Sequence, residues 1–167
     1  MPAAVVNASP LAFLARLGRL DALDVFQPLL TTDVVIQEIE EGLLHGHREI
    51  LAVRDLTERG TLKVRRVAPS PIPGLTLDPG ELTVVQVARG IKGAVAVVDD
   101  LSAIKAARHL GISVRSTPFV LLMNVEGGAI SRDEFARLMD RLMKDGYFLA
   151  PSIYLKLLEG ARTAGRP

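Results

Sequence analysis

The segment at residues 94–98, AVAVV, is an uninterrupted apolar run that ends directly in Asp99 and Asp100. A strand with apolar side chains on both faces is typical of a parallel sheet that helices cover on both sides. Two adjacent carboxylates repel each other unless something positive lies beside them. The segment therefore predicts a buried parallel strand, with a metal ion, a helix N-terminus or only water beside the acid pair.

Strand-like and helix-like patterns alternate along the rest of the chain, with short connections between them. That order favours a parallel α/β sheet flanked by helices. Leu62, Val64 and Val67 alternate with basic residues, which predicts a half-exposed strand. The predicted strands are residues 3–6, 62–67, 94–98 and 112–115, with a short extended piece before residue 32; the predicted helices are residues 10–18, 20–26, 33–44, 49–59, 79–89, 101–110, 117–126, 132–145 and 152–159.

Size and composition favour a single domain, residues 1–167, with a hydrophobic core, because the chain has 167 residues of which 49% are hydrophobic. The 20 basic and 19 acidic side chains give a formal net charge of +1, which excludes a strong global field for nucleic acid but leaves room for a local basic patch. Cysteine is absent, so no thiol nucleophile or cysteine zinc site is available. We expect a cytoplasmic protein, because no apolar run reaches the roughly 18 residues of a membrane span and no signal peptide is evident.

Oxygen-bearing side chains follow the predicted strands at the edge where ligands of open parallel sheets bind. Asn7 follows the first strand, the Asp99–Asp100 pair follows the buried strand, and Thr117 follows the last strand. Glu38 and Glu81 lie on helices that such a fold can bring to the same edge. An all-oxygen set suits Mg²⁺ or Mn²⁺ rather than zinc. Bound there, such an ion lowers the pKa of a water and neutralises charge on a phosphodiester.

Helix capping offers a structural explanation for each of these residues taken singly. Ser9 and Thr117 each precede a proline, as N-cap residues do. Asp78 and Glu81 have the spacing of a capping box, and one acid of the Asp99–Asp100 pair can cap the helix that follows. A single cap leaves the other acid of the pair unexplained.

Five segments, in chain order, resemble PIN-domain proteins over nearly the whole chain: VVNASPLAFLARLGRLDAL, the helix with Glu38, LDPGELTVVQVA, VAVVDDLSAIKAARHLGI and STPFVLL. They are most similar to a PIN-like branch whose first motif is Asn-x-Ser-Pro. The resemblance implies a three-layer α/β sandwich with a central parallel sheet. It also implies a ribonuclease dependent on Mg²⁺ or Mn²⁺, often the toxin of a type II toxin–antitoxin pair.

The same resemblance implies which residues form the site. Catalysis and metal binding would fall to Glu38, Glu81, Asp99 and Asp100, with Asn7 as a further metal ligand. Ser9 would be a supporting polar group. Apart from the resemblance, Thr117 is a further polar candidate because it follows the last predicted strand, and Arg16 and Lys105 are candidates for RNA contact. Asn7 stands where most active members have Asp, and an amide oxygen carries no charge to attract the ion.

Three functions remain as hypotheses. The first is a PIN-type ribonuclease that cuts single-stranded or structured RNA, pairs with an antitoxin and forms a homodimer. The second is a PIN-fold module of weak or absent catalysis that binds RNA or a protein. The third, a response-regulator receiver, fits poorly because its acid pair should end the first strand, whereas this pair comes at residue 99.

Two further clusters have ordinary explanations as well as functional ones. Lys63, Arg65 and Arg66 form a dense basic group that could contact RNA phosphates or form a solvated strand face. His45 and His47 are two residues apart, a weak metal signature that suits solvated imidazoles at a helix end. The apolar residues of FARLMDRLM predict a core or a dimer interface.

Overall fold

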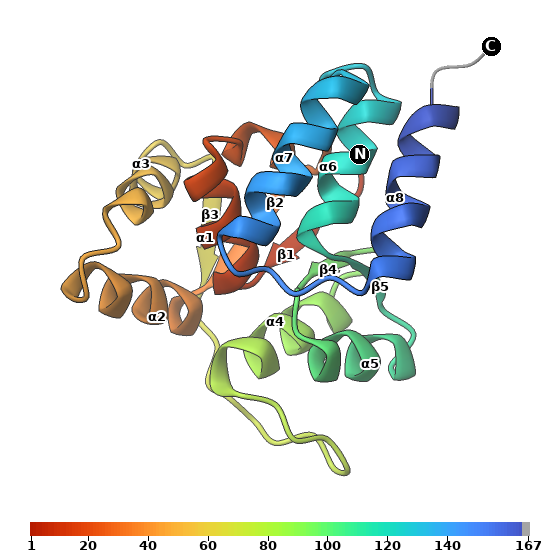
Figure 1. Cartoon of the computed structure of the whole chain (residues 1–167). Coiled ribbons are helices and arrows are strands. Elements are labelled where there is room, and N and C mark those ends of the chain that lie inside the picture. The colour runs from red at the N-terminus through yellow and green to blue at the C-terminus, as the bar shows by residue number, and fades with distance from the viewer. Residues whose placement is uncertain (165–167) are drawn as a thin grey trace. The chain divides into compact units, whose positions relative to one another are not determined.

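A computed structural model describes residues 1–164 of the chain, which form two compact units (Figure 1). The first unit comprises residues 1–116 and contains the whole sheet. The second begins at Thr117 and is helical. None of the helices in the described part of the chain is both long enough and apolar enough to cross a bilayer.

The first unit is built on a five-stranded sheet in the order β3-β2-β1-β4-β5. Each neighbouring pair of strands is parallel. The predicted parallel sheet is therefore confirmed. The strands are β1 (Ala4–Val6), β2 (Leu29–Thr32), β3 (Leu62–Arg65), β4 (Val95–Val97) and β5 (Ser113–Arg115).

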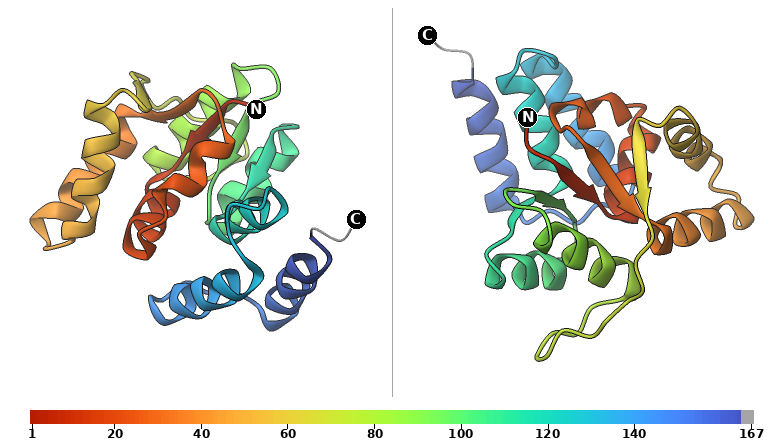
Figure 2. Two further views of the ribbon diagram at one scale, coloured as in Figure 1. Left: turned by 90° about the horizontal axis from the view of Figure 1, so that it is seen from above. Right: turned by 180° about the vertical axis from the view of Figure 1, so that it is seen from behind.

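Helices cover both faces of this sheet, which gives the predicted three layers (Figure 2). Helices α1 and α3 pack together, while α4 contacts β1, β2 and β4 and packs against α5 and α2. The helices of this unit are α1 (Ala8–Leu17), α2 (Asp33–Leu44), α3 (Leu51–Glu58), α4 (Pro79–Arg89) and α5 (Leu101–His109), with 3₁₀ turns η1 (Leu20–Val25) and η2 (Arg48–Ile50).

The three inner strands are the best buried part of the sheet, as the apolar run at residues 94–98 predicts. Every residue of β1, β2 and β4 is buried. In β3 only Leu62 is buried, and the side chain of Val64 is 42% exposed. The predicted alternation of this strand is therefore wrong at Val64, which the rest of the described chain leaves uncovered although it covers Leu62 on the same strand.

The second unit contains three helices, α6 (Thr117–Glu126), α7 (Arg132–Lys144) and α8 (Pro151–Thr163), which pack against one another. Ser131 caps α7 by accepting a hydrogen bond from the N–H of Glu134 at 3.1 Å. The apolar residues of the FARLMDRLM segment are buried within the chain, so they form a core: Phe135, Leu138, Met139 and Leu142. Residues that are apolar and exposed in this unit include Phe148 and Leu155.

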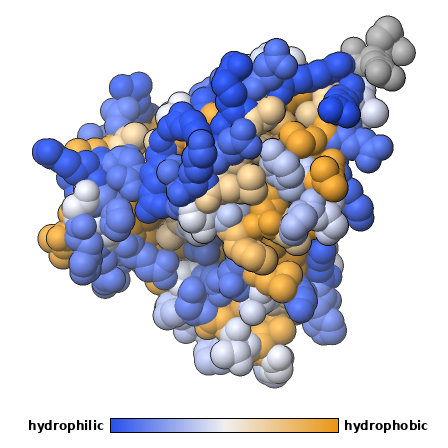
Figure 3. All heavy atoms as spheres, viewed as in Figure 1, coloured by the Kyte–Doolittle hydropathy of each residue, from blue (hydrophilic) through white to orange (hydrophobic). Residues whose placement is uncertain are grey.

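A long loop of the first unit, between β3 and α4, presents both polar and apolar surface at the bottom of Figure 3.

Candidate active site

The strand order places the candidate site between β1 and β4. Chain connections run outward from these two neighbouring strands, toward β2 and β3 on one side and toward β5 on the other. In such doubly wound sheets, ligands bind outside the carboxyl ends of the strands where the winding reverses. Asn7 follows β1 and Asp99 follows β4 by two residues, so topology brings them to this one position.

Asn7 is fixed by its backbone and has an unsatisfied side chain. Its N–H donates to the carbonyl oxygen of Val97 at 3.0 Å, which extends the pairing of β1 with β4. The residue is 6% exposed, and its side-chain oxygen Oδ1 has no hydrogen-bond partner among the described residues. A buried acceptor without a hydrogen bond costs about 1–3 kcal/mol of stability. A cation or a hydrogen-bond donor that reached Oδ1 of Asn7 would therefore be bound favourably.

The two acids after β4 have different partners. Asp100 is the N-cap of α5, and its Oδ1 accepts the N–H groups of Ser102 at 2.7 Å and Ala103 at 3.1 Å. Asp99 Oδ2 accepts the hydroxyl of Ser9 at 3.2 Å. Of the neighbours expected beside this acid pair, a helix N-terminus lies beside Asp100, and the hydroxyl of Ser9 lies beside Asp99.

Ser9 is therefore not an N-cap, and the capping prediction for it is wrong. Helix α1 begins two residues earlier than predicted, at Ala8, with Asn7 at the N-cap position and no side-chain cap bond. Ser9 lies within the first turn, where its hydroxyl reaches across to Asp99 rather than back to its own helix. Ser9 finds this partner because β1 pairs with β4, a contact between distant segments that the local sequence around Ser9 does not show.

The first turn of α4 holds the predicted capping box. Asp78 Oδ1 accepts the N–H of Glu81 at 2.9 Å, and Glu81 Oε2 accepts the N–H of Asp78 at 3.3 Å. Glu81 is 7% exposed. Burial above all, and then the negative charges of Asp78, Asp100 and Glu38, raise the pKa of Glu81 to about 7. These four carboxylates thus interact electrostatically, and we call Glu38, Asp78, Glu81 and Asp100 the acidic cluster.

Glu38 joins this cluster from α2 because Gly80 leaves space for it. Its carboxylate accepts a hydrogen bond from the Gly80 backbone, while burial and then the charge of Asp78 raise the pKa of Glu38. A Cβ atom on Gly80 would stand closer than 3 Å to both oxygens of Glu38. Gly80 is the second residue of α4. The missing side chain is explained by this close approach.

A chain of buried hydroxyls holds α2 against the same turn of α4. Thr32, the N-cap of α2, accepts the N–H of Val35 at 3.2 Å, and its oxygen lies 2.8 Å from the Thr83 hydroxyl oxygen. Thr83 in turn donates to the carbonyl oxygen of Gly80 at 2.9 Å. These bonds connect the start of α2 to Gly80, the residue whose backbone the Glu38 carboxylate contacts.

The raised pKa of Glu81 predicts a fall in stability between about pH 4.5 and pH 7. The folded state holds the Glu81 proton more tightly than the unfolded chain, so raising the pH through this window removes up to about 3 kcal/mol of stability. Urea unfolding in EDTA at pH 5 and pH 8 measures the difference. Glu81→Gln, which still accepts the Asp78 N–H, should reduce it strongly.

Glu40→Gln is the matched control for that measurement, because Glu40 lies on α2 and is exposed. It should leave the pH dependence as it is in the unmodified chain. An unchanged slope in Glu81→Gln would show that the carboxyl of Glu81 is not the group that titrates.

Asp78 and Gly80 are site residues that the sequence interpretation did not identify as such. The sequence predicts only a capping role for Asp78, yet its charge raises the pKa of both Glu38 and Glu81. The Pro-Gly pair between Asp78 and Glu81 was the available signal, because a glycine at the second helical position lacks a local reason. Its tertiary reason is the carboxylate of Glu38.

The remaining predicted residues have other surroundings. Arg16 donates to Glu49 at 2.8 Å and lies over the Phe13 ring, so a carboxylate already pairs with its guanidinium. Lys105 is exposed on α5, beside the loop at residues 74–77. Thr117 is the first residue of α6 and belongs to the second unit. His45 contacts the Glu41 carbonyl at 2.8 Å, and the Nδ1 atom of His47 lies 3.5 Å from the Glu49 carboxylate.

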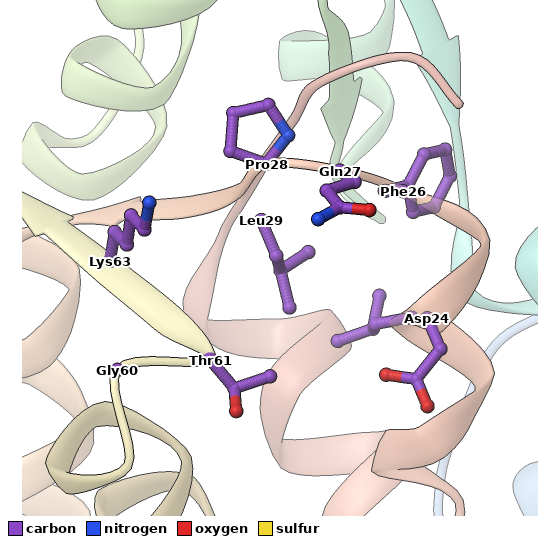
Figure 4. Close-up of a pocket in the computed structure, with 9 residues that line it drawn as sticks. Asp24, Phe26, Gln27, Pro28, Leu29, Gly60, Thr61 and Lys63 are labelled. Carbon is purple, nitrogen blue, oxygen red and sulfur yellow. The ribbon is translucent and has the colours of Figure 1, made fainter.

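A hollow of about 630 Å³ lies at the opposite edge of the sheet, at the amino ends of β2 and β3 (Figure 4). Leu29 lines it, with Asp24 and Lys63 on opposite sides in this view. Asp24 is the sole carboxylate among its lining residues. The concentration of interacting acids, rather than this hollow, therefore marks the candidate site.

The donors at the carboxyl edge are chemically suited to a hard divalent cation. Carboxylate and amide oxygens are the ligands that Mg²⁺ and Mn²⁺ prefer, and the buried, unpartnered Oδ1 of Asn7 is a donor of this kind. Within residues 1–164, no three His, Asp or Glu side chains are close enough together, as they stand, to hold a metal ion. The residue types suit such an ion, but in this structure their oxygen atoms are not arranged to coordinate it.

Residues 3–163 match the family model described as PIN domain. A solved structure of a PilT N-terminus domain protein from the hyperthermophilic archaeon Sulfolobus solfataricus P2 is similar in fold, with a TM-score of 0.50 and 17% sequence identity. The similarity covers 70% of this chain and 88% of that one. No curated protein matches the chain.

Proposed function

The chain belongs to the PIN-domain family, whose members are generally nucleases, and from this premise we propose that it is a ribonuclease dependent on Mg²⁺ or Mn²⁺. The observation that carries the proposal is the acidic cluster at the winding reversal of the sheet, where Glu81 interacts with Glu38 and Asp100. Carboxylates that repel one another in the folded state are stabilised when a cation binds among them.

Asn7, Glu81 and Asp100 would hold the ion, with Glu38 and Asp99 beside them. Bound there, a divalent ion lowers the pKa of water and neutralises charge on the phosphoryl oxygens. Glu38 is kept in place by the Gly80 backbone, and Asp99 by the hydroxyl of Ser9. No side chain of this set need become a covalent nucleophile.

Asn7→Asp should be destabilising without a divalent ion and more responsive to one than the unmodified chain. The new carboxylate would be buried as Asn7 is, and its oxygen at the Oδ1 position would have no hydrogen-bond partner among the described residues. We expect a loss of about 2 kcal/mol, which lowers the melting temperature by several degrees in EDTA. Added Mn²⁺ should then raise that temperature further in the variant than in the unmodified chain.

Asn124→Asp is the control, because Asn124 is also buried, and lies in α6 with its amide donating to Val120. This variant should also be less stable in EDTA, and Mn²⁺ should raise its melting temperature no more than that of the unmodified chain. An equal Mn²⁺ response in Asn7→Asp and the unmodified chain would count against Asn7 as a ligand.

Hydrolysis of single-stranded RNA tests the activity itself. We expect cleavage in Mn²⁺, none in EDTA, and faster cleavage by Asn7→Asp, since a carboxylate binds the ion more strongly than an amide. No turnover in either protein would support the second candidate, a PIN-fold module that binds RNA or a protein partner. The amide at position 7, uncharged where an acid would attract the ion, is the observation that favours this candidate.

The finer assignments belong to the same proposal. The Asn-x-Ser-Pro motif at residues 7–10 supports a place in the branch that carries it, and the toxin role with a partner antitoxin follows from that branch. A cytoplasmic location and a homodimer are proposed with it. Size-exclusion chromatography with light scattering measures the oligomeric state directly.

A further inference from the structure

A basic groove runs between α4 and the segment that follows β3. It consists of two hollows, of about 400 Å³ and about 330 Å³, which share the side chain of Gln86. Arg65 and Arg66 line the first hollow and Arg89 lines the second. Each hollow is of the size at which small-ligand sites begin. We call the two together the α4 groove.

The positive charge of the α4 groove is not neutralised by the protein. Arg65, Arg66 and Arg89 are exposed, and none of the three forms an ion pair within the part of the chain that the structure describes. The acid tied to this segment is Asp33, which accepts the N–H of Val67 at 3.1 Å. Three guanidinium groups against one carboxylate leave a local excess in a chain whose formal net charge is +1.

The walls of the groove are apolar and fixed to each other. Val87 and Ile91 line the first hollow. The amide oxygen of Gln86 accepts the N–H of Ser70 at 3.1 Å, which fastens the loop to the helix. A groove lined by guanidinium groups that form no ion pair suits a flexible polyanion, because each phosphate can then meet a positive charge.

The groove also begins near the acidic cluster. In the parallel pairing of β2 with β3, Arg65 lies opposite Thr32, the residue whose hydroxyl contacts Thr83. Along α4, Arg89 follows Glu81 by eight residues, about 12 Å at the helical rise. A strand of nucleic acid with one phosphate at the acidic cluster would extend into the groove within a few nucleotides.

We propose that the α4 groove binds the phosphates of single-stranded RNA that flanks the bond to be cut, with Arg65, Arg66 and Arg89 as the phosphate contacts. This inference rests on the proposed ribonuclease function for its substrate. It concerns binding, so it is tested without cleavage.

The test is binding of a fluorescent single-stranded RNA by anisotropy, in EDTA and across a range of salt concentrations. Each neutralised phosphate of a single strand contributes about 0.7 to the slope of log K against log salt. The variant R65Q/R66Q/R89Q should therefore lose about 2 from this slope and bind at least about tenfold more weakly at 0.1 M salt.

The matched control is R54Q/R108Q/R137Q, which removes three exposed arginines from α3, α5 and α7. It should retain the slope to within about 0.7. Equal slopes for the two triple variants would overturn the proposal. So would a poly-glutamate peptide that competes for the groove as strongly as RNA of equal charge, because the groove would then be a site for acidic protein.

Failure of the groove and failure of the ribonuclease proposal give different results. With a short dinucleotide substrate, the groove variant should cleave as the unmodified chain does, and with long RNA its KM should rise while kcat stays unchanged. Salt-dependent binding without cleavage would reject the ribonuclease function and support the groove. Cleavage with unaltered KM in the groove variant would reject the groove alone.

Discussion

Asp100→Asn should reduce ribonuclease activity by at least about a hundredfold while leaving the fold intact, as expected for a metal ligand whose charge is lost. Asparagine and aspartate are equally good N-cap residues. The side-chain oxygen that accepts the N–H groups of Ser102 and Ala103 is retained, and only the negative charge is removed. The measurement is the rate of RNA cleavage in Mn²⁺, with the melting temperature recorded on the same samples.

Asp100→Ser and Asp100→Ala separate the two roles of this residue. Serine also caps helices, so Asp100→Ser should be inactive and nearly as stable as the unmodified chain. Alanine cannot cap, so Asp100→Ala should be inactive and less stable by about 1 kcal/mol. If Asp100→Asn cleaves RNA at the unmodified rate, the carboxylate serves only as a cap and the assignment of Asp100 to the site is wrong.

Gly80→Ala is the second substitution with a large expected effect. In an ordinary helical position this change stabilises a protein by about 0.5–1 kcal/mol. Here the new Cβ would overlap the Glu38 carboxylate, which is the end of a flexible side chain and must move aside, so we expect this gain to be cancelled. Displacement of Glu38 should also lower Mn²⁺ affinity, which isothermal titration calorimetry measures together with urea unfolding.

A double-mutant cycle with Glu38→Ala assigns the loss to this contact. Once the carboxylate is absent, Gly80→Ala should give the ordinary helical gain, which corresponds to a coupling of about 0.5–1 kcal/mol between the two positions. Gly90→Ala, at the other end of the same helix, is the control, because its φ is −75° and a Cβ there meets nothing closer than 3.5 Å. A coupling near zero would show that Glu38 moves aside without cost.

These predictions share a physical basis in the first turn of α4. Glu38, Asp78 and Glu81 meet there, and each accepts a hydrogen bond from the backbone or raises the pKa of a neighbour. Any group that neutralises this turn, whether a proton or a divalent ion, stabilises the folded chain. Protons and Mn²⁺ should therefore compete, and Mn²⁺ affinity should rise from pH 5 to pH 8.

Much of the fold could be predicted from local patterns. The apolar run at residues 94–98 became β4, the Asp78–Glu81 capping box formed as predicted, and the alternation of elements gave the parallel sheet. The helix at residues 152–159 was predicted too short, because α8 extends to Thr163 through a glycine that usually favours a helix end. Such patterns depend on residues within one or two helical turns of each other, so they can be recognised from the sequence alone.

The sequence proposes which residues form the site, but not which of them contact one another. The charges of Glu38 and Asp100 raise the pKa of Glu81, and the joint role of the three residues in a site stays a prediction. Asp78 and Gly80 were missed because their roles depend on a carboxylate from α2, about forty residues earlier in the chain. Ser9 was assigned to a cap because its real partner, Asp99, lies ninety residues away.

Periodicity and capping act over a few residues, so the order of amino acids already indicates the parallel sheet, the positions of most helices and the oxygen donors at strand ends. The folded chain shows which donors meet, which are satisfied by backbone N–H groups, and which oxygen has no partner among the described residues. Those outcomes depend on the strand order and on the packing of α2 against α4, which bring distant segments within a few ångströms of each other.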